Sequence, residues 1–353
     1  MNLDQMLEAA VNKEASDIFL VVGQPVSFKI EGLIEKQSDQ RLTPDQMEEI
    51  VNQLYGMAHR DTVYRSRGDD DFSVSLCNVG RFRVNVFKQR GSWGAVLRVV
   101  TFDLPDVSKM NIPKSILELG EKRKGLILVT GPAGSGKSTS LAYIIDQINR
   151  NRNCHILTLE DPIEFLHKHQ ESIVSQREIG IDSINYGRAL KAAMREAPDV
   201  ILIGEMRDLE TIETAITAAE TGHLVLSSLH TIGAASTIDR IIDVFPPTQQ
   251  QQIRMQLSMV LQSVVSQQLL QNEQGKMVPA FEIMHVNKAI QTMIRDGKVH
   301  QINSQIATSA DAGMITMDKS LLNLYRAGEI SYATALSACI NKEVMERELK
   351  LVR

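Results

Sequence analysis

The chain has 353 residues, 43% of them hydrophobic, which is enough for a sizeable core and for two or three domains. Its net charge of −5 and its pI of about 6.0 exclude a global electrostatic field that would favour nucleic acid or an anionic membrane. The three cysteines, Cys77, Cys154 and Cys339, lie far apart without a C-x-x-C pair, which argues against a zinc site or a disulfide framework and fits a reducing compartment.

The sequence carries no signal for export or for membrane insertion. Residues 1–5 lack the basic region and the apolar core of a signal peptide. No apolar run approaches the roughly 20 residues that are needed to span a bilayer. We therefore expect a cytosolic protein that reaches a membrane only through a partner or a surface.

The first hundred residues predict a small α+β domain. A short amphipathic helix is expected over 3–11, and a second helix begins at Thr43, which is followed by Pro44 and, three residues on, by Gln46. Strands are expected at Ile18–Val22, Ser27–Ile30, Asp71–Leu76, Arg81–Phe87 and Ala95–Val100. We place an N-terminal domain at 1–101, a linker that contains Pro105 at 102–112, and a second domain at 113–353.

Strands and helices alternate beyond the linker, a pattern that predicts a parallel, doubly wound α/β sheet. Strands are expected at 126–130, 155–160, 200–204 and 224–229, and helices at 138–150, 185–196 and 209–220. Helices are expected to dominate from Pro247 onward, around Ile253–Leu270, Lys288–Asp296 and Met317–Ala327.

A phosphate-binding loop follows the first strand of this second domain. The pattern G-x-x-x-x-G-K-[ST] is matched at every required position by Gly131, Pro132, Ala133, Gly134, Ser135, Gly136, Lys137, Ser138 and Thr139. The glycines let backbone N–H groups close around phosphates, and the helix that follows adds partial positive charge at its N-terminus. Lys137 brings a cation to the β- and γ-phosphates, and the hydroxyl of Ser138 holds Mg²⁺. The sequence therefore predicts a site for a nucleoside triphosphate.

Polar side chains follow three further strands of the predicted sheet. Glu160, Glu205 and His230 stand at the carboxyl ends of strands 155–160, 200–204 and 224–229, the edge at which an open α/β sheet binds its ligands. We predict that Glu205 is the general base for the water that attacks the γ-phosphate. Glu160 is expected to orient Mg²⁺ or its waters, and His230 to sense the γ-phosphate through a hydrogen bond.

Three nearby side chains are weaker candidates. Asp161 precedes Pro162 and is a turn position. Asp199 lies six residues before Glu205, roughly 20 Å away along an extended strand and at its wrong end, so it is better explained as a turn residue. His223 begins the strand that His230 ends, so it belongs to the opposite edge, where a structural or interface role explains it at least as well.

The stretch 81–98 contains several basic residues and no acidic one. Arg81, Arg83 and Asn85 share one face of a strand, because successive side chains alternate between faces. An ordinary solvated strand face would explain this pattern. It also fits a set of arginines that meets an anion, either nucleic acid or a nucleotide bound elsewhere in an assembly.

Four motifs in order along the chain resemble one protein superfamily. Residues 131–139, 159–165, 203–208 and 221–231 resemble the Walker A, acidic-box, Walker B and histidine-box motifs of the RecA-like secretion ATPases. Residues 15–17 and 81–98 are similar to the small PAS-like domain that precedes the ATPase domain in that family. The resemblance implies an α/β fold in which a RecA-like P-loop NTPase domain is preceded by a smaller α+β PAS-like domain.

Features near the C-terminus are similar to one branch of this superfamily. Residues 289–302 and 312–321 are similar to motifs of the PilT-like type IV pilus retraction ATPases, with departures at Gln291, Thr292, Met293 and Asp296. The tetracysteine element that is usual in the pilus assembly and type II secretion members is not supplied by three scattered cysteines. The resemblance thus implies a motor that hydrolyses ATP to retract pili.

Three other functions remain as alternatives. A pilus assembly or type II secretion ATPase would come from the same superfamily. A RecA-like nucleic-acid translocase is disfavoured by the acidic pI and by an aromatic content of 5%. A regulatory subunit that does not hydrolyse ATP is disfavoured because Lys137, Glu160 and Glu205 are all present.

The resemblance also implies an assembly and a place in the cell. The family forms homohexameric rings with ATP and Mg²⁺ between subunits, and its arginines nearest the phosphates correspond here to Arg83, Arg98 and Arg240, the first two from the N-terminal domain. It further implies work on an inner-membrane pilus platform protein at the cytoplasmic face of the inner membrane. Neither a transmembrane segment nor nucleic acid is expected to take part.

Overall fold

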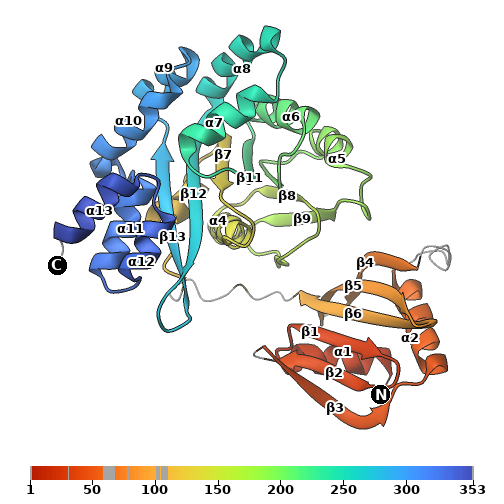
Figure 1. The fold of residues 1–353 in the computed structure, drawn as a ribbon. Coiled ribbons are helices and arrows are strands. Elements are labelled where there is room, and N and C mark those ends of the chain that lie inside the picture. The colour runs from red at the N-terminus through yellow and green to blue at the C-terminus, as the bar shows by residue number, and fades with distance from the viewer. Residues whose placement is uncertain are drawn as a thin grey trace. The chain divides into compact units, whose positions relative to one another are not determined.

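The computed structural model describes residues 2–30, 32–58, 68–77, 79–100, 104 and 110–351. The chain separates into two compact units, Met1–Asp103 and Leu104–Arg353 (Figure 1). Residues 102, 103 and 105–109 of the predicted linker lie outside the described part of the chain, and the domain limits set from sequence stay a prediction.

The N-terminal unit is an antiparallel sheet with two helices, in the strand order β3-β2-β1-β6-β5-β4. Its strands are β1 (Asp17–Val21), β2 (Pro25–Ile30), β3 (Leu33–Arg41), β4 (Asp69–Leu76), β5 (Gly80–Gln89) and β6 (Ser92–Val100). Helices α1 (Leu3–Asn12) and α2 (Pro44–Met57) bury apolar side chains in the core of this unit, and Thr43 and Gln46 close the expected capping box on α2. The α+β prediction is confirmed, except that β3 was missed because its residues beyond Leu33 and Ile34 are polar and exposed.

The C-terminal unit contains a seven-stranded sheet in the order β13-β12-β7-β11-β10-β8-β9. Its strands are β7 (Gly125–Thr130), β8 (His155–Glu160), β9 (Ile173–Glu178), β10 (Val200–Ile203), β11 (Leu224–Leu229), β12 (Leu261–Gln271) and β13 (Met277–His285). All neighbours pair in parallel except β13, which runs antiparallel to β12. The predicted parallel sheet is therefore confirmed, with an antiparallel strand added at one edge.

Helices cover both faces of this sheet, as expected for a doubly wound fold (Figure 1). Leu126 and Leu128 of β7 face one layer, while Ile127 and Val129 face the other, because strand side chains alternate. The first layer holds α5 (Tyr186–Ala193), α6 (Leu209–Glu220), α7 (Ala234–Asp243), α8 (Pro247–Val260), α9 (Lys288–Arg295) and α10 (Ile302–Thr308). The second holds α3 (Lys114–Leu117) and α4 (Lys137–Asn151), and a separate cluster packs α11 (Met317–Arg326), α12 (Tyr332–Ala338) and α13 (Lys342–Leu351) on β13.

The predicted helix Ile253–Leu270 is wrong in its second half. Helix α8 ends at Val260, and the chain continues as β12, which pairs with β7 on one side and β13 on the other. A strand buried between two neighbours reads as a short apolar run, which periodicity alone does not separate from a buried helix. Strands β9 and β13, which form the two edges of the sheet, were also missed.

In the part of the chain that the structure describes, no helix combines the length and the apolar character that crossing a membrane requires.

Candidate nucleotide-binding site

The phosphate-binding loop lies between β7 and α4 and depends on glycine backbone geometry. Gly131, Gly134 and Gly136 have φ angles of 144°, 74° and 86°, in the region that other residues rarely adopt. Gly136 is the N-cap of α4 and Lys137 its first residue, so the N-terminus of the helix points its free N–H groups into the loop. This backbone arrangement favours an anion.

Strand β12 packs directly against the phosphate-binding loop. A Cβ on Gly131 would stand 2.1 Å from the carbonyl oxygen of Gln267, and a Cβ on Gly136 would stand 2.8 Å from its Nε2. The buried Gln267 side chain also accepts a hydrogen bond of 2.8 Å from Ser140 Oγ in α4. One residue of β12 thus contacts both ends of the loop, and its backbone carbonyl leaves room only for glycine at position 131.

Lys137 points its amine back across the loop. Its Nζ donates to the carbonyl oxygens of Gly131 and Pro132, at 3.0 and 2.9 Å, and lies 3.4 Å from Nδ1 of His230. Burial lowers the pKa of Lys137, and the negative charge of Glu205 opposes that shift. A phosphate at this position would supply further negative charge and favour the protonated amine.

His230 and Glu205 continue this chain of contacts along the carboxyl edge of the sheet. His230 Nε2 lies 3.2 Å from Glu205 Oε2, and Arg207 forms an ion pair with Glu205 Oε1. Nδ1 of the His230 ring thus faces the Lys137 amine, and Nε2 faces the Glu205 carboxylate. The structure therefore brings together the predicted base, the predicted phosphate sensor and the lysine of the loop.

Glu160 ends β8 at the same edge in a polar niche. Its Oε1 accepts hydrogen bonds from Thr158 Oγ1 at 2.6 Å and from Gln176 Nε2 at 3.3 Å. Burial raises the pKa of Glu160 from its ordinary 4.5 to about 7, although these two hydrogen bonds act against the shift. Such a carboxyl group is ready to become ionised when a cation or a water shell arrives.

The residues of the loop fit a nucleotide phosphate with bound Mg²⁺. Thr130 Oγ1 and Ser135 Oγ are buried beside the loop without a hydrogen-bond partner, so both can donate to phosphate oxygens. Ser138 follows Lys137 in the first turn of α4, and its hydroxyl and the Glu160 carboxylate are oxygen ligands of the kind that Mg²⁺ prefers. Among the described residues, no group of three His, Cys, Asp or Glu side chains is arranged to hold a metal on its own.

Other sequence candidates lie away from this edge. Asp199 precedes β10 and accepts a hydrogen bond of 2.9 Å from the backbone N–H of His155, at the amino ends of the strands. His223 precedes β11 at that same edge, and its Nδ1 lies 2.9 Å from the carbonyl oxygen of Ala218. Both positions agree with the structural roles expected for them. Arg240 lies in the last turn of α7 with its side chain exposed.

Arg83 and Arg98 belong to the N-terminal unit. They are register partners on β5 and β6, and both side chains are exposed. Arg98 Nε pairs with Asp17 Oδ1 at 3.3 Å. On its other side, Arg83 has Ser73 of β4 as its register partner. The two arginines thus lie side by side on one face of the sheet, and both carry positive charge.

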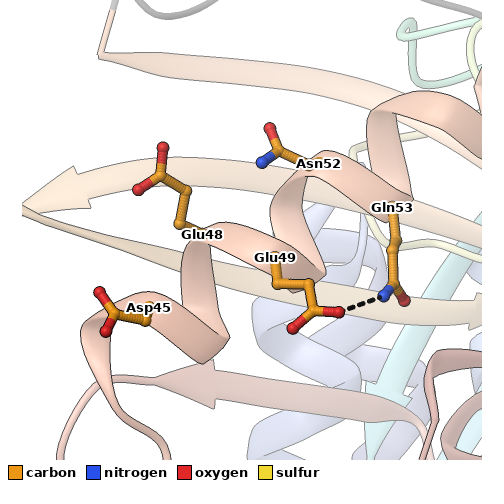
Figure 2. Close-up of a pocket in the computed structure, with 5 residues that line it drawn as sticks. All are labelled: Asp45, Glu48, Glu49, Asn52 and Gln53. Carbon is orange, nitrogen blue, oxygen red and sulfur yellow. Dashed lines mark hydrogen bonds between the residues drawn. The ribbon is translucent and has the colours of Figure 1, made fainter.

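An acidic surface on α2 also lies in the N-terminal unit (Figure 2). It is a hollow lined by Asp45, Glu48, Glu49, Asn52 and Gln53, and Gln53 Nε2 donates to Glu49 Oε1 at 3.4 Å. Its three carboxylates would repel phosphate, so this surface is no candidate for nucleotide binding.

Sequence reasoning missed Gln267, Tyr186 and Glu282. The hydroxyl of Tyr186 lies 2.9 Å from where a Cβ on Gly204 would stand, so it fills the space beside the predicted base. Glu282 is buried in β13, where it accepts hydrogen bonds from two helices. All three act through contacts between distant segments, and no local motif marks them.

Comparisons with known proteins agree on one family. A family model described as type II/IV secretion system protein matches residues 1–348. The chain is 41% identical over 335 residues to the type IV pilus retraction ATPase PilT of Pseudomonas aeruginosa, covering 95% of this chain and 97% of that protein. It is 44% identical over 301 residues to a twitching motility protein of Neisseria gonorrhoeae, covering 84% and 80%. The crystal structure of the pilus retraction motor PilT with bound ADP matches with a TM-score of 0.87 at 44% identity, covering 98% of this chain and 99% of that chain.

The glycines of the loop supply a matched pair of variants. Gly131→Ala places a Cβ against the Gln267 carbonyl and should lower the free energy of unfolding by about 3 kcal/mol or more, with loss of nucleotide binding. Gly134→Ala has only the strained φ angle to accommodate, since nothing lies within 4 Å of its Cβ, and should cost about 1 kcal/mol. Urea denaturation and the binding of a fluorescent ATP analogue measure both effects. Equal losses in the two variants would contradict the role of β12.

The raised pKa of Glu160 makes stability depend on pH. The unfolded chain releases this proton near pH 4.5 and the folded protein near pH 7, so ionisation destabilises the fold as pH rises between these values. Glu160→Gln removes the titration and keeps an oxygen for Thr158. From about pH 5 to about pH 8, the variant should gain about 2 kcal/mol in unfolding free energy relative to the wild type. Urea denaturation in metal-free buffer measures this, and a difference between variant and wild type that is the same at pH 5 and at pH 8 would contradict the raised pKa of Glu160.

Proposed function

The chain belongs to the family of type II/IV secretion system proteins, and we propose that it is a motor ATPase that hydrolyses ATP to power type IV pilus retraction. The observation that carries the proposal is the chain of contacts from Lys137 through His230 to Glu205, beside the phosphate-binding loop. The family match and the PilT relatives confirm the resemblance found in the four sequence motifs. They also support the expected fold, a RecA-like ATPase domain preceded by a smaller α+β domain.

The residues of the site fall into two groups, those that bind ATP and those that take part in its hydrolysis. The loop N–H groups and Lys137 bind the β- and γ-phosphates, and Thr130 and Ser135 add hydroxyl donors. Glu205 polarises the attacking water, and the ion pair with Arg207 holds its carboxylate in place. His230 lies between Lys137 and Glu205, so a γ-phosphate between these groups would meet its ring. Ser138 and Glu160 would hold Mg²⁺, which neutralises charge that develops on the phosphates.

We further propose that the active unit is a homohexamer in which one subunit completes the site of the next. Each ATP would receive Arg83 and Arg98 from an N-terminal unit, together with Arg240 from a C-terminal one. Neighbouring arginines on one exposed strand face suit an anion that carries several charges. This use explains a basic face on a protein whose net charge is −5.

The work would be done on an inner-membrane pilus platform protein, at the cytoplasmic face of the inner membrane. Pilus assembly is the second candidate function, since assembly and retraction motors share this family. Retraction is favoured by the similarity to PilT and to the twitching motility protein over most of each chain. Deleting the gene separates the two, because loss of a retraction motor leaves surface pili in excess and loss of an assembly motor leaves none.

Variants of the site should separate binding from turnover. Lys137→Ala should weaken ATP binding, because the phosphates lose their cation. Glu205→Gln should keep ATP affinity but lower kcat by on the order of a hundredfold, because an amide is a poor base of unchanged size. In the deletion strain, a Glu205→Gln copy should fail to restore retraction.

The matched control is Glu196→Gln. Glu196 pairs with Arg177, and its carbonyl oxygen bonds to His155 at the opposite edge of the sheet. The Glu196→Gln variant should keep both ATP turnover and pilus retraction. If Glu205→Gln hydrolysed ATP at nearly the wild-type rate, the assignment of Glu205 as the general base would be wrong.

Hydrolysis should require neighbouring subunits. Arg83→Ala alone should lower kcat by on the order of a thousandfold, as expected when an arginine that stabilises a transferring phosphoryl group is lost. Mixing Arg83→Ala with Glu205→Gln subunits should restore part of the turnover, at interfaces where an intact Glu205 meets an intact Arg83. The measurement is ATPase activity against mixing ratio in rings of verified composition. If turnover in mixed rings equals the sum of the two separate variants, Arg83 acts within its own subunit or only in folding.

A further inference from the structure

Glu282 is a buried carboxylate on β13 that the proposed reaction does not use. Only 2% of the residue is exposed, and its cross-strand partner on β12 is Ser266. A carboxylate in such a place is costly unless both oxygens are hydrogen-bonded. Each oxygen of Glu282 accepts a backbone N–H from a different helix.

The first helix is α7, which begins just after the predicted phosphate sensor. Its N-cap is Gly233, only three residues beyond His230, and glycine offers no side chain to cap the helix. The cap comes from the strand pair instead. Ser266 Oγ accepts from Gly233 N at 2.9 Å, and Glu282 Oε1 accepts from Ala234 N at 2.7 Å. The position of the His230 segment therefore depends on β12 and β13.

The second helix is α11, in the cluster of C-terminal helices. Glu282 Oε2 accepts from the N–H of Met317, the first residue of α11, at 3.3 Å. Ile283 and Ile315 exchange backbone hydrogen bonds of 2.8 and 3.1 Å, and Phe281 N donates to Ser320 Oγ at 3.1 Å. The start of α11 is thus attached to β13 next to Glu282.

We propose that Glu282 is a positioning residue that couples nucleotide binding at His230 to the C-terminal helices α11–α13. One carboxylate caps both helices, so a shift of the α7 N-terminus changes the hydrogen bond that Glu282 makes to α11. Burial raises the pKa of Glu282, and its hydrogen bonds to the backbone N–H groups of Ala234 and Met317, at the two helix N-termini, oppose that shift. This inference rests on the proposed ATPase function, in which His230 meets the γ-phosphate.

A purely structural cap is the competing explanation. It predicts that the loss of Glu282 destabilises the fold without changing how the protein responds to nucleotide. Thr316 supplies a matched comparison, because its side chain caps the same helix by accepting from Lys319 N at 3.3 Å and has no hydrogen bond to α7 among the described residues. Thr316→Ala therefore weakens the α11 N-terminus while leaving the connection to His230 intact.

The experiment compares the full-length wild type with Glu282→Gln and Thr316→Ala. Steady-state ATPase assays give kcat and KM, and amide hydrogen exchange of residues 317–326 is measured with and without AMP-PNP. In the wild type, AMP-PNP should change exchange in α11. In Glu282→Gln that response should be lost and kcat should fall by on the order of tenfold, with KM within about twofold of the wild type. Thr316→Ala should raise exchange in α11 under both conditions yet keep its response to AMP-PNP.

Two results would overturn the proposal. One is a wild type that hydrolyses ATP but shows no effect of AMP-PNP on α11, and the other is a Glu282→Gln variant that keeps both the response and kcat. If Glu282→Gln does not fold, Ser266→Ala removes only the cap on Gly233, and it should weaken the α11 response in the same direction; an unchanged response would count against the proposal. A wild type without ATPase activity would instead contradict the proposed function, so the two failures are distinguishable.

Discussion

The close contact between the phosphate-binding loop and strand β12 is the constraint on which the rest of the C-terminal unit depends. The loop backbone lies so near the carbonyl oxygen of Gln267 that Gly131 has no room for a side chain. This requires β12 to lie directly beside β7, which is its place in the sheet. The strand that supports the loop also carries Ser266, which caps α7 together with Glu282 of β13. Nucleotide binding and the C-terminal helices are therefore built on the same pair of strands.

Parallel strands explain how the chemistry gathers in one place. β7, β8, β10 and β11 all end at one edge, so four short segments far apart in the sequence meet there. Each brings one part of the candidate site: the phosphate-binding loop follows β7, while Glu160, Glu205 and His230 supply the acidic and imidazole groups. Backbone contacts hold the strand ends in register, as in the bond from Gly131 N to the carbonyl of Leu229. The loop is thereby joined directly to the strand end that precedes His230.

The sequence predicted which side chains lie at this edge because the strands and the motifs that follow them are encoded locally. A glycine-rich loop and an acid or histidine at the end of an apolar strand can be recognised from a few consecutive residues. Gln267 and Glu282 could not be recognised in this way, since their roles come from pairing between β7, β12 and β13. The helix expected across β12 shows the same limit, because burial on both sides removes the alternation that identifies a strand. The roles of Gln267 and Glu282 and the conformation of β12 therefore depend on pairing between distant strands rather than on a local sequence pattern.

The hydrogen bonds of Lys137 indicate why binding and hydrolysis are linked at this site. Its amine donates to two carbonyls of its own loop, so an incoming phosphate oxygen must compete with neutral acceptors. A charged acceptor makes the stronger hydrogen bond, and burial of the amine increases the difference. A phosphate drawn toward Lys137 also approaches Glu205, whose charge would oppose it. Arg207 and the ring of His230 both contact that carboxylate. The groups that we propose to bind the γ-phosphate are thus in direct contact with the proposed base.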